Sequence, residues 1–232
     1  MKKTWCIGKL DAAFIARLEQ ILYLYGLPFD AHYPVICFDE RPCFLIGDSV
    51  AGLQMKAGQA ARQHYAYEKH GSCALLAALE PQTGKRLARV FDQRTKREYA
   101  LFMKELAGRY PTAKKIRLVQ DNLNTHVISA FYETFSAEEA FALAQRFEFY
   151  YTPKSASWLN MIEIEFSALS KQCLNRRIAS QEELSQEVLA VVKEREEKAI
   201  KINWQFSIAS ARSKLNRHYQ QVNAENAQYQ KT

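Results

Sequence analysis

Hydrophobic and polar positions follow two different periods along the first third of the chain. Apolar residues at helical spacing predict an amphipathic helix over residues 11–25, which ends at a Gly-Leu-Pro sequence. The short apolar run at 34–40 predicts a buried strand that ends in two acids. Residues 41–69 are polar and contain glycine, so we interpret them as a long connection or insertion without a defined form.

The rest of the chain alternates between helical and strand patterns. Residues 72–80 and 86–93 flank a Pro-Gln-Thr-Gly turn sequence and are predicted to form a β-hairpin. The pattern then predicts a helix at 96–110, a strand at 116–122, helices at 125–135 and 137–146, a strand at 147–153, and helices at 159–174 and 180–198. This order predicts an α/β protein with a mixed sheet, without a Rossmann or Walker A sequence for a nucleotide cofactor.

The composition is that of an ordinary globular protein, with 232 residues of which 48% are hydrophobic. No apolar run approaches the roughly 20 residues of a membrane helix, and the first residues do not resemble a signal peptide. We therefore predict a cytoplasmic protein that does not associate with membranes. The cysteines form no CxxC pair, which argues against a zinc site or a disulfide framework; they are Cys6, Cys37, Cys43, Cys73 and Cys173.

Positive charge is concentrated in one segment of the chain. The net charge is +7, and residues 85–117 contain eleven Lys or Arg against three acids. Such a run is most often the solvated exterior of helices and strand edges. The alternative is a surface that attracts a polyanion, which an enzyme acting on phosphodiesters would need.

Three carboxylates occupy settings that suit oxygen ligands of metal ions. Asp39 and Asp121 each end an apolar strand, and Glu163 lies on the helix predicted at 159–174. A pair of hard divalent cations needs such ligands, so metal-dependent chemistry on phosphate is our first hypothesis. The alternative is that the aspartates serve turns or caps and the glutamate only solvates its helix. Glu163 and Glu165 lie on opposite margins of the buried stripe, and periodicity does not choose between them.

Several sequence blocks carry a resemblance to a known family. The blocks VICFDE, LVQDNLNTH and FYYTPKSASWLNMIEIEF, followed by ALSKQCLNRR, resemble the catalytic domain of bacterial insertion-sequence transposases related to the mariner superfamily. The signature of that family is an Asp, Asp, Glu triad on a ribonuclease-H-like fold. The resemblance extends from the helix near residue 11 to about residue 219, and DNLNTH and TPKSASWLN-x-IE are its most specific parts.

The resemblance implies that Asp39, Asp121 and Glu163 are the catalytic residues and the metal ligands. Glu163 is preferred because the family glutamate lies three positions after the Asn of the last block, and Glu165 is the alternative. Two features depart from the family pattern: Met161 stands where many relatives have proline, and the 41 residues between the second and third acids exceed the usual spacing.

The implied fold is an α/β, ribonuclease-H-like domain with a mixed five-stranded sheet flanked by helices. We expect this catalytic domain over residues 31–200, an N-terminal helical segment over 1–30 and a C-terminal extension over 201–232. The implied cofactor is two Mg²⁺ ions, for which Mn²⁺ can substitute. They would activate water for strand cleavage and then the freed 3′-hydroxyl for attack on target DNA.

The implied partner is double-stranded DNA, both the element ends and a target that in this family is usually TA. Near the site, Lys154, Arg176 and Arg177 are expected to contact phosphates, and His126 to position water or DNA, while Trp158 is expected in the core. A homodimer is expected in the synaptic complex. About 30 residues before the first strand are too few for a pair of helix-turn-helix modules, so end recognition implies a separately encoded helix-turn-helix protein.

We therefore interpret the chain as a catalytic half, either a second reading frame, a fragment or a decayed copy. Two alternatives to a transposase stay open at the level of sequence. One is a catalytically silent DNA-binding remnant, which the three intact acids argue against. The other is a ribonuclease-H-like nuclease with another substrate.

Overall fold

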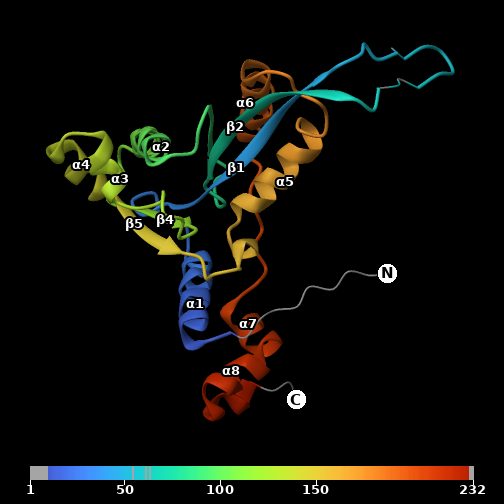
Figure 1. Ribbon diagram of the computed structural model, residues 1–232. Coiled ribbons are helices and arrows are strands. Elements are labelled where there is room, and N and C mark those ends of the chain that lie inside the picture. Colours follow the sequence, from blue (N-terminus) through green and yellow to red (C-terminus); the bar gives the residue numbers. More distant parts are fainter. Residues whose placement is uncertain (1–9, 54, 61, 63, 230–232) are drawn as a thin grey trace.

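The centre of the molecule is a mixed sheet of five strands (Figure 1). The computed structural model describes residues 10–53, 55–60, 62 and 64–229. The strand order is β3-β2-β1-β4-β5, in which β1, β2 and β3 are antiparallel neighbours and β4 and β5 extend the sheet in parallel with β1. The strands are β1 Val35–Asp48, β2 Tyr67–Leu79, β3 Arg86–Phe91, β4 Ile116–Gln120 and β5 Phe147–Tyr151. This arrangement confirms the predicted α/β, mixed five-stranded fold.

Helices cover both faces of the sheet. One face packs against α1, α5 and α6, and the other against α2, α3 and α4 (Figure 1). The helices are α1 Ala12–Gly26, α2 Lys96–Gly108, α3 Ser129–Thr134, α4 Ala137–Ala144, α5 Ile162–Gln172, α6 Gln181–Glu197, α7 Ile208–Lys214 and α8 Asn216–Val222, with short 3-10 helices η1 Ser157–Leu159 and η2 Ala224–Tyr229. None of the described helices is long and apolar enough to cross a membrane.

Alternation along β1 divides the apolar residues between two cores. Val35 and Cys37 belong to the core under α1, α5 and α6, whereas Ile36 and Phe38 belong to the core under α2, α3 and α4. Successive side chains of a strand point to opposite faces, so Asp39 continues the first series. Its carboxylate therefore points to the face that α5 covers.

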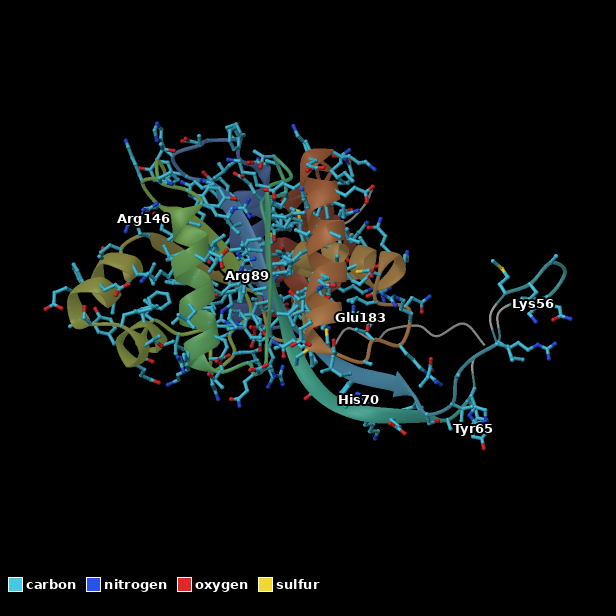
Figure 2. All side chains as sticks on the ribbon, turned by 90° about the horizontal axis from the view of Figure 1, so that it is seen from above. Lys56, Tyr65, His70, Arg89, Arg146 and Glu183 are labelled. Carbon is cyan, nitrogen blue, oxygen red and sulfur yellow. The ribbon has the colours of Figure 1, made fainter. Side chains whose placement is uncertain are left out.

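The structure corrects the prediction for residues 41–69. Strand β1 does not end near Asp39 but continues to Asp48, and β2 begins at Tyr67, so the two strands form a long hairpin arm (Figure 2). The arm projects from the body of the molecule and carries the labelled residues Tyr65 and His70. Its polar composition hid the strands because a two-stranded extension buries little apolar surface.

The helix predicted over 125–135 is shorter than expected. Residues 125–128 form turns, and α3 begins only at Ser129. In this turn His126 donates its backbone N–H to the carbonyl of Leu123, and its side chain is completely buried. The polar residues after β4 thus form a turn that directs the chain into the molecule, and they do not start a helix.

Segments from the two ends of the chain lie side by side (Figure 1). Arg212 on α7 donates two hydrogen bonds to Glu19 on α1, at 2.7 and 2.8 Å, and Tyr219 on α8 donates a third at 2.8 Å. Trp204 places its ring 5.4 Å from that of Tyr25. The boundaries predicted near residues 30 and 200 stay predictions.

Candidate active site

Strands β1 and β4 place two aspartates next to each other. Cys37 on β1 pairs with Val119 on β4 in parallel register. Asp39 and Asp121 each follow two residues later, so the constant register of parallel strands sets them side by side where β4 ends. Asp39 is half-buried, and its Oδ1 accepts a hydrogen bond of 2.8 Å from the backbone N–H of Glu40.

Helix α5 brings the third acid near enough for its charge to act on Asp39. The buried amide of Asn160 donates to the carbonyl oxygen of Phe38 at 2.8 Å, which joins the start of α5 to the residue before Asp39. The backbone N–H of Glu163 donates to the Asn160 carbonyl at 3.1 Å. The sequence pointed to Asn160 only as a motif residue, and the structure shows that it ties α5 to β1.

A second contact holds the other part of α5 against β1. The Arg41 guanidinium donates to the Phe166 carbonyl oxygen at 3.4 Å and to the hydroxyl of Ser170. Glu163 is exposed between these two attachments and lines a cleft together with Glu40 and Arg41. The carboxylate of Glu163 therefore has access to solvent and to a ligand that reaches Asp39.

The electrostatics of Asp39 reflect this gathering of acids. Burial, together with the negative charges of Asp121 and Glu163, raises the pKa of Asp39 to about 7, against the opposing effects of the Glu40 N–H and of His126. Two like charges and a partly dry environment thus oppose ionisation of this carboxyl. A bound cation would remove that opposition, so the donor set suits a hard divalent ion.

His126 connects Asp121 to a further acid that sequence reasoning did not single out. Its Nδ1 lies 2.6 Å from Asp121 Oδ1, and its Nε2 lies 2.8 Å from Glu40 Oε2. Burial alone would lower the pKa of His126, but the Asp121 and Glu40 carboxylates raise it to about 9. The imidazolium is therefore charged at neutral pH, and it fixes the orientation of the Asp121 carboxylate. The alternation of side chains along β1 could have predicted the placement of Glu40, because it directs Glu40 to the face opposite that of Asp39.

Glu165 lies on the other side of α5 in a buried ion cluster. Its Oε1 accepts from Arg86 Nε at 3.0 Å and from Arg195 Nε at 2.9 Å, and its Oε2 accepts from Arg195 Nη2 at 2.9 Å. The glutamate and Arg86 are both almost completely buried. Glu165 is thus committed to holding α5 against β3 and α6, and Glu163 is the acid of α5 that acts on the pKa of Asp39.

Comparison with known proteins shows to which family the chain belongs. Residues 34–185 match the sequence model of the family described as DDE superfamily endonuclease. The chain belongs to this family. The match contains both strands and the helix that carry the three acids.

Solved structures of a transposase share the fold of this DDE endonuclease. One is the Mos1 mariner paired end complex with Mn, with a TM-score of 0.51 and 14% identity over 100% of this chain and 69% of that chain. Another is the Mos1 transposase paired-end complex with left transposon end, with a TM-score of 0.51 and 15% identity over 100% of this chain and 67% of that one. No curated protein matches the chain. The predicted ribonuclease-H-like fold and the membership of the DDE superfamily are confirmed.

The residues predicted to contact DNA are not all near the acids of the DDE endonuclease. Lys154 is exposed in the loop after β5 and lines one groove with Asp121. Arg176 instead pairs with Glu183 at 3.0 Å and Glu187 at 2.8 Å. Their role in DNA binding stays a prediction.

Arg177 and Trp158 also have intramolecular partners. Arg177 pairs with Asp48 at 2.6 Å and donates to the backbone carbonyls of Ala66 and His64, at the outer end of the paired strands of the hairpin arm. Trp158 is 47% exposed and not in the core as expected, because its ring lies at the surface, 5.8 Å from Phe206 of the C-terminal segment.

The basic run at 85–117 is largely neutralised by acids from other elements. Seven of its eleven cations form ion pairs: Arg86 with Glu165, Arg89 with Glu105, Arg94 with Glu40, Lys96 with Glu133, Lys104 with Glu139, Arg109 with Glu196, and Arg117 with Glu148. This pairing favours the solvated-exterior interpretation of the run over a polyanion surface.

The three acids suit a metal ion through the chemistry of their oxygen donor atoms. Among the described residues, no three His, Cys, Asp or Glu side chains stand close enough together to hold one metal ion. The oxygen donors and the raised pKa of Asp39 nevertheless suit hard cations. Of the cysteines, Cys37, Cys43, Cys73 and Cys173 are free and buried, and Cys6 lies outside the described residues.

Proposed function

We propose that this DDE endonuclease is the catalytic domain of a DNA transposase, in which Asp39, Asp121 and Glu163 hold two divalent metal ions. The observation that carries the proposal is that Asp39 lies half-buried near two other acids: burial, together with the negative charges of Asp121 and Glu163, raises its pKa to about 7. Membership of the DDE superfamily and the fold shared with Mos1 transposase support it. The Mos1 complex with Mn supports a divalent ion, and we propose Mg²⁺ as the natural one.

The chemistry follows from what each side chain can do. When bound, the ions would supply Lewis acidity, lowering the pKa of water and of a 3′-hydroxyl so that each can attack a phosphodiester. The carboxylates of Asp39, Asp121 and Glu163 would hold the ions through oxygen. His126 keeps the Asp121 carboxylate in place, and Asn160 keeps α5 and Glu163 against β1. No side chain needs to form a covalent intermediate.

The proposed partners are those of a transposase. The relevant solved structures are paired-end complexes, one of them with a transposon end. For this chain we propose double-stranded DNA, namely element ends and a TA target, a homodimer that joins two ends, and a separate helix-turn-helix protein for end recognition. The proposed place of action is the cytoplasm. Nothing specific in the structure favours a nuclease with another substrate.

The direct test is nicking of supercoiled plasmid DNA with Mg²⁺ or Mn²⁺. Asp121→Asn keeps the size of the side chain but removes a charged ligand, so nicking is expected to fall at least about 100-fold while DNA binding in a gel-shift assay is retained. The matched control is Asp30→Asn, at an exposed residue before β1 whose Oδ1 accepts from the His32 N–H. Unchanged nicking by Asp121→Asn would contradict the assignment. Binding without nicking by the wild type would indicate a silent remnant.

A further inference from the structure

A groove opens beside Asp121 between the N-terminal helix and the loop that follows β5. Helix α1 contributes one wall through Arg17, and the loop contributes the other. Its polar lining includes Arg17, Asp121, Asn122, Lys154, Ser155 and Ser157. Because Asp121 belongs to both the groove and the carboxylate cluster, a chain lying in the groove would run directly into the proposed active site.

The groove contains two cations whose charge is not neutralised by a neighbour. Arg17 and Lys154 are both exposed, and no ion pair joins either of them to an acid of the described chain. The basic run at 85–117 differs, because most of its cations are bound to acids. Unneutralised positive charge beside the carboxylates is therefore supplied by α1 and the loop after β5.

The other groups in the groove suit the oxygens of a phosphodiester. Asn122, Ser155 and Ser157 add amide and hydroxyl donors, and such side chains commonly contact DNA phosphates together with Arg and Lys. Ser155 has a φ of 61°, a left-handed conformation that turns the loop sharply between Lys154 and η1. Both cations can thus face the same ligand from opposite walls.

Arg17 stands on a helix that is held at several points. The neighbouring Leu18 is completely buried in the core, and Glu19 accepts hydrogen bonds from Arg212 and Tyr219. Tyr25 donates to the carbonyl of Leu159, just before α5, at 2.9 Å. Although Arg17 lies outside the residues that match the family, its position relative to the active site is set by these contacts.

We propose that this groove is a subsite for the DNA backbone next to the phosphate that is cut, with Arg17 and Lys154 as its phosphate contacts. The inference rests on the proposed function and deepens it by naming where the substrate lies. It assigns a role to α1, and through Glu19 and Arg212 the C-terminal segment keeps that helix in position.

The salt dependence of DNA binding tests the groove quantitatively. A fluorescent double-stranded oligonucleotide would be titrated with the metal-free protein at several KCl concentrations, by anisotropy. Each phosphate contact contributes about 0.9 to the slope of log K against log salt. Arg17→Gln and Lys154→Gln are each expected to reduce the slope by about 0.9, the double variant by about 1.8, and Arg17→Lys to retain it.

The matched control is Lys193→Gln, a cation on α6 that is 77% exposed and changes the net charge equally. Its slope is expected to equal that of the wild type. If the slopes for Arg17→Gln and Lys154→Gln equal the control slope, the proposed DNA subsite is wrong. The proposed function would still stand in that case, provided that the wild type nicks DNA and Asp121→Asn does not. A wild type that neither nicks nor binds DNA would refute both. Thermal unfolding midpoints show that each variant is folded.

Discussion

The position of Asp39 in the site lowers the stability of the metal-free protein. Folding places its carboxyl in a half-buried position beside two other acids, and the pKa rises from 3.8 to about 7. Ionisation of Asp39 therefore costs free energy in the folded protein but not in the unfolded chain. A structure would retain such a residue where a bound cation compensates the cost.

Replacement of this carboxyl should stabilise the metal-free protein. Because the pKa of Asp39 is raised on folding, the wild type loses stability as pH rises from about 4 to 7, and Asp39→Asn does not. Asp39→Asn is expected to increase the free energy of unfolding on the order of 2 kcal/mol at pH 8, and much less at pH 5. Urea unfolding at the two pH values measures this, and a destabilised variant at pH 8 would contradict the carboxylate cluster.

Glu40 acts on the site through His126. Glu40→Gln keeps an acceptor for His126 Nε2 but removes the charge that faces the imidazolium. Loss of such a supporting partner typically costs 10- to 100-fold in metal affinity or activity, so we expect nicking to fall by about that factor and half-maximal activity to need more Mn²⁺.

The control for Glu40 is Glu133→Gln on the surface of α3, where the acid pairs with Lys96. A merely structural role would lower the thermal midpoint without shifting the Mn²⁺ concentration needed. The shift in Mn²⁺ dependence is therefore the decisive readout, and its absence would remove Glu40 from the site.

At the scale of elements, α5 carries two acids with separate tasks. Glu163 is exposed and its charge raises the pKa of Asp39, whereas Glu165 neutralises Arg86 and Arg195 in the interior. Removing one partner of a buried ion pair leaves an uncompensated charge and typically costs about 3–5 kcal/mol. We expect Glu165→Gln to destabilise the protein by about that amount, and Glu163→Gln to change its stability by less than about 1 kcal/mol.

Urea unfolding of the two variants distinguishes these tasks, and each is the matched control of the other. Nicking should be lost in Glu163→Gln although the protein is folded. Should the folded fraction of Glu165→Gln lack activity while Glu163→Gln retains it, the third ligand would be assigned to the wrong glutamate.

At the scale of the whole molecule, some features were predictable from local sequence and others were not. The strand at 34–40, the strand before Asp121 and the block around Asn160 have strong local patterns, and the family resemblance of these blocks implied the fold and the three acids. The hairpin arm did not, because its strands bury little apolar surface. The choice of Glu163 over Glu165 depends on Arg86 and Arg195, which are distant in sequence.

Charge showed the same limit of local prediction. The sequence of the basic run at 85–117 left a polyanion surface open as an alternative to a solvated exterior, and acids from α3, α4, α5 and α6 are among those that neutralise the run. Arg17 gave no signal at all, since its approach to Asp121 arises from the packing of α1. Which cations lack an acidic partner can therefore be determined only from the folded structure.

The central claim is that Asp39, Asp121 and Glu163 act together as a metal-dependent catalytic set on DNA. The most direct measurement is the rate at which wild type and the variants Asp39→Asn, Asp121→Asn and Glu163→Gln nick supercoiled plasmid across a titration of Mg²⁺. The account predicts no nicking without metal, nicking by the wild type with it, and loss in all three variants. Nicking by any of the three at the wild-type rate, or nicking without a divalent ion, would contradict it.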